Sequence, residues 1–197
     1  MMKRTYSHEI AEAISNYLNN NDLKHNFNKS LGVFTFSAGV TGKIKTLYYE
    51  LIVNKTGFTS CAHYPLGPDS DDEEARNLMA QFLTRANYGM RIGNFQMEMD
   101  EGDISYKVYC SCLGMTISDE MIAESIHCSA AMFAKYEPGI LGILFGGMTA
   151  KQAADRCEWS IRTSLEELKA RLEQIHRSGE QKMDSGIVDQ EEEQVDW

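Results

Sequence analysis

The chain has 197 residues, 43% of them hydrophobic and 24% charged, which is the composition of a globular protein and excludes a collagen-like or low-complexity one. This length allows one domain with extensions, or two small domains, and a hydrophobic core that needs no disulfide or metal to fold. The formal net charge of −10 argues against a protein that binds nucleic acid or an anionic membrane surface.

The first part of the chain predicts one helix and then three strands. Apolar residues recur at intervals of three and four over 7–21, which is typical of a helix with one buried face, and Ser7 is its expected N-cap. Runs of β-branched and aromatic residues then predict strands separated by short turns, which together make an antiparallel meander. The expected strands are residues 25–36, 43–54 and 57–64.

Two turns are expected within this meander. Asn54-Lys55-Thr56-Gly57 predicts a hairpin in which Gly57 takes a positive φ. Gly39-Val40-Thr41-Gly42-Lys43 is loosely similar to a phosphate-binding loop, but it lacks the four-residue spacing between glycines and does not precede a helix. We therefore interpret the second stretch as a loop between strands and not as a nucleotide site.

A helix and two strands are predicted next. Ser70 and Glu73 match the S-x-x-E capping box of a helix over 71–87, whose acidic first turn suits the helix dipole. Alternation of apolar and polar side chains then predicts two strands joined by a turn at Asp100-Glu101-Gly102-Asp103. The expected strands are residues 92–99 and 103–112.

The last part predicts two helices and a tail. A helix is expected over 118–136, and Pro138-Gly139 is expected to break it. Thr149-Ala150-Lys151-Gln152 is a second capping box, which opens a long amphipathic helix. The expected organisation is an α+β domain over 1–148, a helix over 149–177 and an acidic disordered tail over 178–197.

Local sequences spread over about residues 7–157 are similar to those of one known family. They are Gly32-Val33-Phe34-Thr35-Phe36, Gly42-Lys43-Ile44, Gly57-Phe58, Arg85-Ala86-Asn87-Tyr88-Gly89, Gly93-Asn94-Phe95, Asp100 to Tyr106 and Phe133 to Gly147. With the order α-β-β-β-α-β-β-α, they resemble the YbjN-like domain, whose fold is that of type III secretion chaperones. The resemblance implies a two-layer sheet-and-helix sandwich that dimerises and binds peptides or proteins. None of these sequences is a catalytic motif.

Two apolar features are candidates for binding a partner. The run Gly139 to Met148 is too short to cross a membrane, and it either packs as a turn that covers the core or forms an exposed patch. In the last helix, apolar spacings of 4, 3, 4 and 3 make a short heptad seam, which covers the domain's own core or pairs with another chain. The candidate partner-binding residues are Ile140, Leu141, Ile143, Leu144, Phe145, Ile161, Leu165, Leu168, Leu172 and Ile175.

The cysteines suggest a different chemistry. The basic N-terminus is not followed by an apolar signal core, so we expect a cytoplasmic protein with reduced thiols. Cys61 and His63 stand two apart on a strand and so point the same way, as a nucleophile and base would, but no orienting acid is evident. The pair Cys110 and Cys112 also shares one face, the expected core side, but lacks a matching second pair of zinc ligands.

These features favour a non-catalytic protein-binding module with a chaperone-like or regulatory role, acting as a homodimer. No catalytic residue, cofactor, metal, nucleic acid or membrane partner is predicted. The alternative is a cysteine/histidine-based metal-binding sensor or enzyme built around Cys61, His63, Cys110 and Cys112. A third hypothesis is that the acidic tail docks onto a basic partner.

Overall fold

The computed structural model describes residues 5–158 and Lys169. The chain divides into two units, residues 1–157 and 158–197, and the helices and strands with assigned bounds belong to the first. The predicted tail over 178–197 lies outside the described residues, as do five candidate partner-binding residues. These are Ile161, Leu165, Leu168, Leu172 and Ile175.

The first unit is α+β, as the sequence predicts. Its elements are α1 (His8–Asn20), β1 (His25–Asn28), β2 (Val33–Gly39), β3 (Thr46–Val53), β4 (Gly57–His63), α2 (Glu73–Tyr88), β5 (Asn94–Met97), β6 (Ile104–Ser111) and α3 (Asp119–Gly146). A further helical segment covers residues 150–158. No helix of the described residues combines the length and the hydropathy needed to cross a bilayer.

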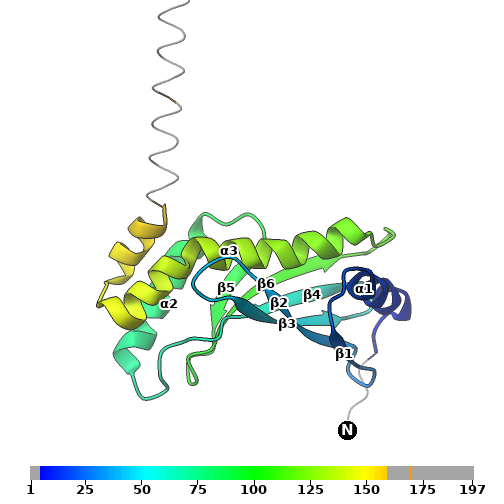
Figure 1. The fold of residues 1–197 in the computed structure, drawn as a ribbon, viewed down its shortest axis with the longest axis horizontal. Coiled ribbons are helices and arrows are strands. Elements are labelled where there is room, and N and C mark those ends of the chain that lie inside the picture. The colour runs from blue at the N-terminus through cyan, green and yellow to red at the C-terminus, as the bar shows by residue number, and fades with distance from the viewer. Residues whose placement is uncertain (1–4, 159–168, 170–197) are drawn as a thin grey trace, which may run out of the picture. The chain divides into compact units, whose positions relative to one another are not determined.

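The six strands form one antiparallel sheet in the order β1-β2-β3-β4-β6-β5. Burial alternates along β3: Leu47, Tyr49 and Leu51 are fully buried, whereas Thr46 and Tyr48 are exposed. Alternation of this kind means that one face of the sheet packs on the core and the other faces solvent. Figure 1 shows α3 running along the covered face, and α3 contacts both α1 and α2.

Aromatic side chains hold α3 on the sheet. Phe133 of α3 stacks on Tyr64, which directly follows β4, with 5.1 Å between ring centroids. The ring of Phe95 in β5 meets Phe133 edge-on at 5.3 Å. The Tyr49 hydroxyl of β3 donates to the carbonyl of Ile126 at 3.2 Å. Helix α3 is therefore tied to strands at both the middle and the end of the sheet.

The N-cap predicted at Ser7 is confirmed, and the serine that precedes α3 caps that helix in the same way. Ser7 accepts a hydrogen bond from the Ile10 amide, and Ser118 accepts one from the Met121 amide. The predicted capping box at the start of α2 is wrong: Asp72 is the N-cap, and its carboxylate accepts from the Ala75 amide at 2.9 Å. Asp and Ser cap helices about equally well, so sequence preference alone does not choose between neighbouring cap residues.

The prediction of one strand over 25–36 is also wrong, because the chain turns between β1 and β2. The Asn28 side-chain oxygen accepts from the amides of Ser30 and Leu31. Gly32 completes the turn in a left-handed conformation, at φ +70°. An Asn side chain that bonds the backbone just beyond it competes with strand pairing, and here it adds a short edge strand to the predicted order.

The predicted break at Pro138-Gly139 does not occur, and α3 continues through both residues to Gly146. A proline inside a helix costs about 3 kcal/mol. Burial of Ile140 and Ile143, each worth roughly 1.5–3 kcal/mol, offsets that cost. The apolar run is therefore the end of a long helix and not a turn.

The Asn54–Gly57 hairpin is confirmed, but the expected positive φ at Gly57 is wrong. A Cβ at Gly57 would lie 2.2 Å from the carbonyl oxygen of Cys110 on β6. Glycine is needed there because β4 and β6 approach closely, and not because of the turn conformation.

We predict that Gly57→Ala destabilises the fold by about 2 kcal/mol or more, since a strand backbone must move to admit the methyl group. Urea unfolding measures the change. Gly89→Ala is the matched control, because Gly89 has φ −97° and no atom within 4 Å of the added Cβ. Equal midpoints for the two variants would contradict the close approach.

Candidate functional site

Helical geometry divides the apolar run at the end of α3 between two faces. Ile140 and Ile143 are buried in the core. Leu141 and Leu144 are half-buried, and Phe145 is 75% exposed. Of the five residues predicted here to bind a partner, two therefore serve the core, and Phe145 is the one that solvent reaches most.

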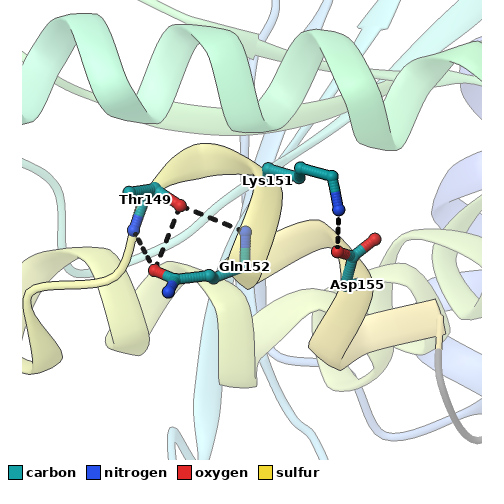
Figure 2. A network of polar contacts seen from close by, with 4 residues as sticks. All are labelled: Thr149, Lys151, Gln152 and Asp155. Atoms are coloured by element: carbon teal, nitrogen blue, oxygen red, sulfur yellow. Dashed lines mark hydrogen bonds and ion pairs between the residues drawn. The ribbon is translucent and has the colours of Figure 1, made fainter.

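The chain reverses at the end of α3 and starts a new helical segment. Gly147 caps α3 in a left-handed conformation, and the Met148 amide donates to the Gly142 carbonyl at 3.0 Å. Figure 2 shows the predicted capping box in place: the Thr149 amide donates to Gln152 Oε1 at 3.0 Å, and the Gln152 amide donates to Thr149 Oγ1 at 3.3 Å. The cap fixes the direction in which residues 150–158 leave α3.

This segment packs into the core of the first unit through its small side chains. Ala150, Ala153 and Cys157 are all buried there. On the opposite, solvent side, Lys151 pairs with Asp155 at 2.6 Å (Figure 2). The start of the predicted helix 149–177 therefore covers the domain's own core, whereas its heptad positions lie outside the described residues.

An open groove lies between α3, the β2–β3 loop and the chain that follows α3. Its volume is about 490 Å³. The lining residues are Lys43, Glu137, Pro138, Leu141, Gly142, Phe145, Gly146, Met148 and Arg156. The floor is apolar or lacks side chains, and the rim carries charges, which is typical of a binding site for an amphipathic segment.

Glu137 closes one end of this groove with a buried carboxylate, which is 6% exposed. Its two oxygens accept from the amides of Lys43 and Ile44, both at 2.7 Å. The Tyr64 hydroxyl donates to the same carboxylate at 3.2 Å, and burial beside this charge raises the pKa of Tyr64. The glycine-containing loop that resembles a phosphate loop in sequence thus binds an anion, but the anion is the protein's own side chain.

The remaining charges on the groove are basic. Lys43 and Arg156 are exposed, and neither forms an ion pair with another described residue. The Glu137 carboxylate already accepts three hydrogen bonds, so it has little capacity left for a ligand. In a chain of net charge −10, this rim favours an acidic group on whatever fills the groove.

The four cysteine and histidine residues of the alternative hypothesis do not converge. Cys110 lies on the helix side of β6 opposite Phe58, and Cys112 is buried just beyond it. Cys61 and His63 lie on the open face of β4. Within the part of the chain that the structure describes, no group of three or more His, Cys, Asp or Glu side chains is arranged to hold a metal ion.

Burial makes the helix-side thiols poor nucleophiles. It raises the pKa of Cys110 to about 11, helped by the neighbouring Cys112 and Glu124, and it also raises the pKa of Cys112. A thiol with a raised pKa carries little thiolate at neutral pH. These two cysteines therefore act as small core residues.

On the open face, by contrast, His63 has the acidic neighbour that the local sequence does not reveal. Its Nε2 lies 3.7 Å from Oε2 of Glu50 on the adjacent strand β3. A hydrogen bond with Cys61 raises the pKa of His63, the charges of Cys61, Glu50 and Asp103 add to that effect, and partial burial opposes it. Sequence reasoning missed Glu50 because only the register of β3 against β4 brings it there.

No family model matches this chain, and no curated protein and no solved structure is significantly similar to it. Function is therefore inferred from the geometry of the described residues. The likeness to the YbjN-like domain stays a proposal.

We predict that Glu137→Gln destabilises the fold by roughly 2–3 kcal/mol, because an amide has one accepting oxygen and turns an N–H group toward a backbone donor. Urea unfolding measures the loss. Glu124→Gln, an exposed change on the same helix, is the control and is expected to stay within about 0.5 kcal/mol of the wild type. Similar stability of both variants would show that the carboxylate does not anchor the loop.

We predict that His63 makes stability depend on pH. Its pKa is raised in the fold above the unfolded value of about 6.5, so its stabilising effect is fully present below that pH and is lost as pH rises through the folded pKa. The difference in unfolding free energy between wild type and His63→Gln is then larger at about pH 5.5 than at about pH 8.5. Glu50→Gln is expected to reduce this change. An equal difference at both pH values would contradict the assignment.

Proposed function

We propose that this chain is a non-catalytic protein-binding module with a chaperone-like or regulatory role, and that the groove at the end of α3 holds an apolar segment of its partner. The exposure of Phe145 carries the proposal, because a large aromatic ring stands 75% exposed at the edge of a hollow. Leu141 and Met148 extend the same apolar surface. Exposed apolar surface around a groove is typical of a protein-interaction site.

The charges at the rim of the groove indicate the charge of the partner segment. Lys43 and Arg156 stand at the groove without an ion pair among the described residues, so a segment with an acidic residue beside its apolar anchor is the best complement. Burial of one apolar side chain against Phe145 and Leu141 contributes roughly 1.5–3 kcal/mol, and the charges contribute mainly to selectivity. An extended or helical segment of a partner protein meets both requirements.

We further propose that the fold is type III secretion chaperone-like and that the chain is YbjN-like and cytoplasmic. The element order supports the fold assignment: after α1, a meander, α2, a β-hairpin and α3 follow in the expected sequence. The short strand β1 is an addition to that order. A sheet covered on one face agrees with the two layers that the resemblance implies.

Homodimer formation is part of the same proposal. The heptad spacing from Ile161 to Ile175 supports it from the sequence alone, since those residues lie outside the described ranges. A second copy of the chain is then one occupant that the groove can accept.

A phage-displayed peptide library selected on the folded chain tests the groove. We predict enrichment of peptides that place a large apolar residue next to Asp or Glu. Phe145→Asp is expected to weaken the selected peptides by about 2 kcal/mol or more, as loss of a central aromatic anchor does. Arg156→Glu is expected to weaken peptides with the acidic residue selectively.

Tyr88→Asp is the matched control, because Tyr88 is 96% exposed at the end of α2 and does not line the groove. Sedimentation of the same proteins reads the oligomeric state. A dimer that Phe145→Asp converts to monomer identifies the second copy as the occupant and supports the proposal. Absence of enrichment together with a monomeric wild type, or equal binding by Phe145→Asp, would overturn it.

A further inference from the structure

The open face of the sheet, opposite the helices, carries a cluster of titratable side chains that peptide binding in the groove does not use. Antiparallel register places Cys61 of β4 directly between Glu50 of β3 and Lys107 of β6. His63 follows two residues along β4 and therefore shares this face with Cys61. Directly opposite residues in an antiparallel sheet have Cβ atoms about 5 Å apart, so the four side chains are neighbours.

Contacts on two sides orient the His63 ring. The Glu50 carboxylate lies 3.7 Å from Nε2. The Tyr48 ring packs against the imidazole, with 5.8 Å between centroids. Cys61 precedes His63 by two residues on the same face of β4, and its thiol raises the pKa of His63. The thiol, the imidazole and the carboxylate thus lie next to one another in that order on the sheet. A base beside the thiol and an acid beside the base is the usual arrangement around an activated cysteine.

Cys61 also differs from the other strand cysteines in its surroundings. It is 5% exposed, but it lies outside the buried hydrophobic cluster that contains Cys112 and that Cys110 packs against. Its neighbours are side chains of the sheet surface, including the cation Lys107. Surface side chains change rotamer within nanoseconds, so we expect a small reagent to reach the sulfur without unfolding of the sheet.

We propose that Cys61 is a reactive thiol that exchanges with low-molecular-weight disulfides, with His63 as its base and Glu50 as the group that holds the imidazolium in place. Beyond the groove function, this gives the chain a site of reversible covalent modification on its other face. It does not depend on the proposed peptide binding.

The exchange balances without a further oxidant. The Cys61 proton passes to His63, and the thiolate attacks one sulfur of the small disulfide. The sulfur–sulfur bond of the reagent breaks as the mixed disulfide with Cys61 forms, and the second half leaves as a thiolate, which takes the proton from His63. The reagent is the oxidant, because one of its halves is released as a free thiol.

Competitive labelling of the full-length protein tests this proposal. Native protein is treated with limiting iodoacetamide at neutral pH, and peptide mass spectrometry gives the rate at each of the five cysteines. We expect Cys61 to react faster than Cys110 and Cys112. His63→Gln is expected to slow the alkylation of Cys61 by about tenfold, and Glu50→Gln is expected to slow it by less. The reason is that the thiolate is the nucleophile and the imidazole takes the proton of the thiol. With glutathione disulfide, one reducible adduct is expected, at Cys61.

Thr59→Val is the matched control, since Thr59 flanks Cys61 on the same strand and face but carries no titratable group. Its Cys61 rate is expected to equal that of the wild type. If the labelling rate of His63→Gln rises at all five cysteines, that variant is unfolded, and the Cys61 rate of Glu50→Gln then decides the role of the cluster. The proposal is overturned if wild-type Cys61 reacts no faster than Cys110, or if folded His63→Gln or Glu50→Gln leaves its rate unchanged.

Discussion

The buried carboxylate of Glu137 is the constraint on which the arrangement around the groove depends. A carboxylate removed from water must be given hydrogen-bond donors, and here they come from two other parts of the chain: the amides of Lys43 and Ile44 and the hydroxyl of Tyr64. Those contacts join α3 to the β2–β3 loop and to the end of β4, which are distant in sequence. The requirement to satisfy one charge therefore positions the loop that forms a wall of the groove and presents Lys43 at its rim.

The one-sided sheet separates two kinds of chemistry. On the helix side, side chains such as Tyr49 and Phe133 are buried and leave no room for an exposed polar cluster. On the other side, the same strands present Glu50, Cys61 and His63 in adjacent positions, where the imidazole can hold a proton between an acid and a thiol. Successive side chains of a strand point to opposite faces of the sheet, so the same strands supply both faces. The position of a residue along its strand therefore decides whether its side chain packs in the core or lies in the titratable cluster.

Local patterns predicted much of the fold and little of the site, for a physical reason. Amphipathic spacing in α1, the serine caps and the Thr149 capping box are properties of a few consecutive residues, and they were found. The continuation of α3 through Pro138 depends on what Ile140 and Ile143 bury, which the local sequence does not contain. The pairing of Glu50 with His63 depends on strand register, and the two amides that donate to Glu137 lie more than 90 residues away in sequence. The local sequence shows the apolar run itself, but helical periodicity decides which of its members face solvent.

Glycine spacing explains why a groove exists at this end of α3. Gly139 lets Phe82 and Cys157 approach the helix, and a Cβ there would lie 2.5 Å from the Phe82 ring. Gly142, one turn later, admits the Met148 sulfur in the same way, whereas Gly146 meets nothing within 4 Å. Positions three and four apart lie on one side of a helix, so these three residues make a stripe without side chains. Its first part is filled by the protein's own side chains and its last part is open, and the exposed ring of Phe145 stands next to that opening. In the local sequence these glycines indicate a turn. In α3, which burial stabilises, they instead leave space beside the helix into which other groups fit.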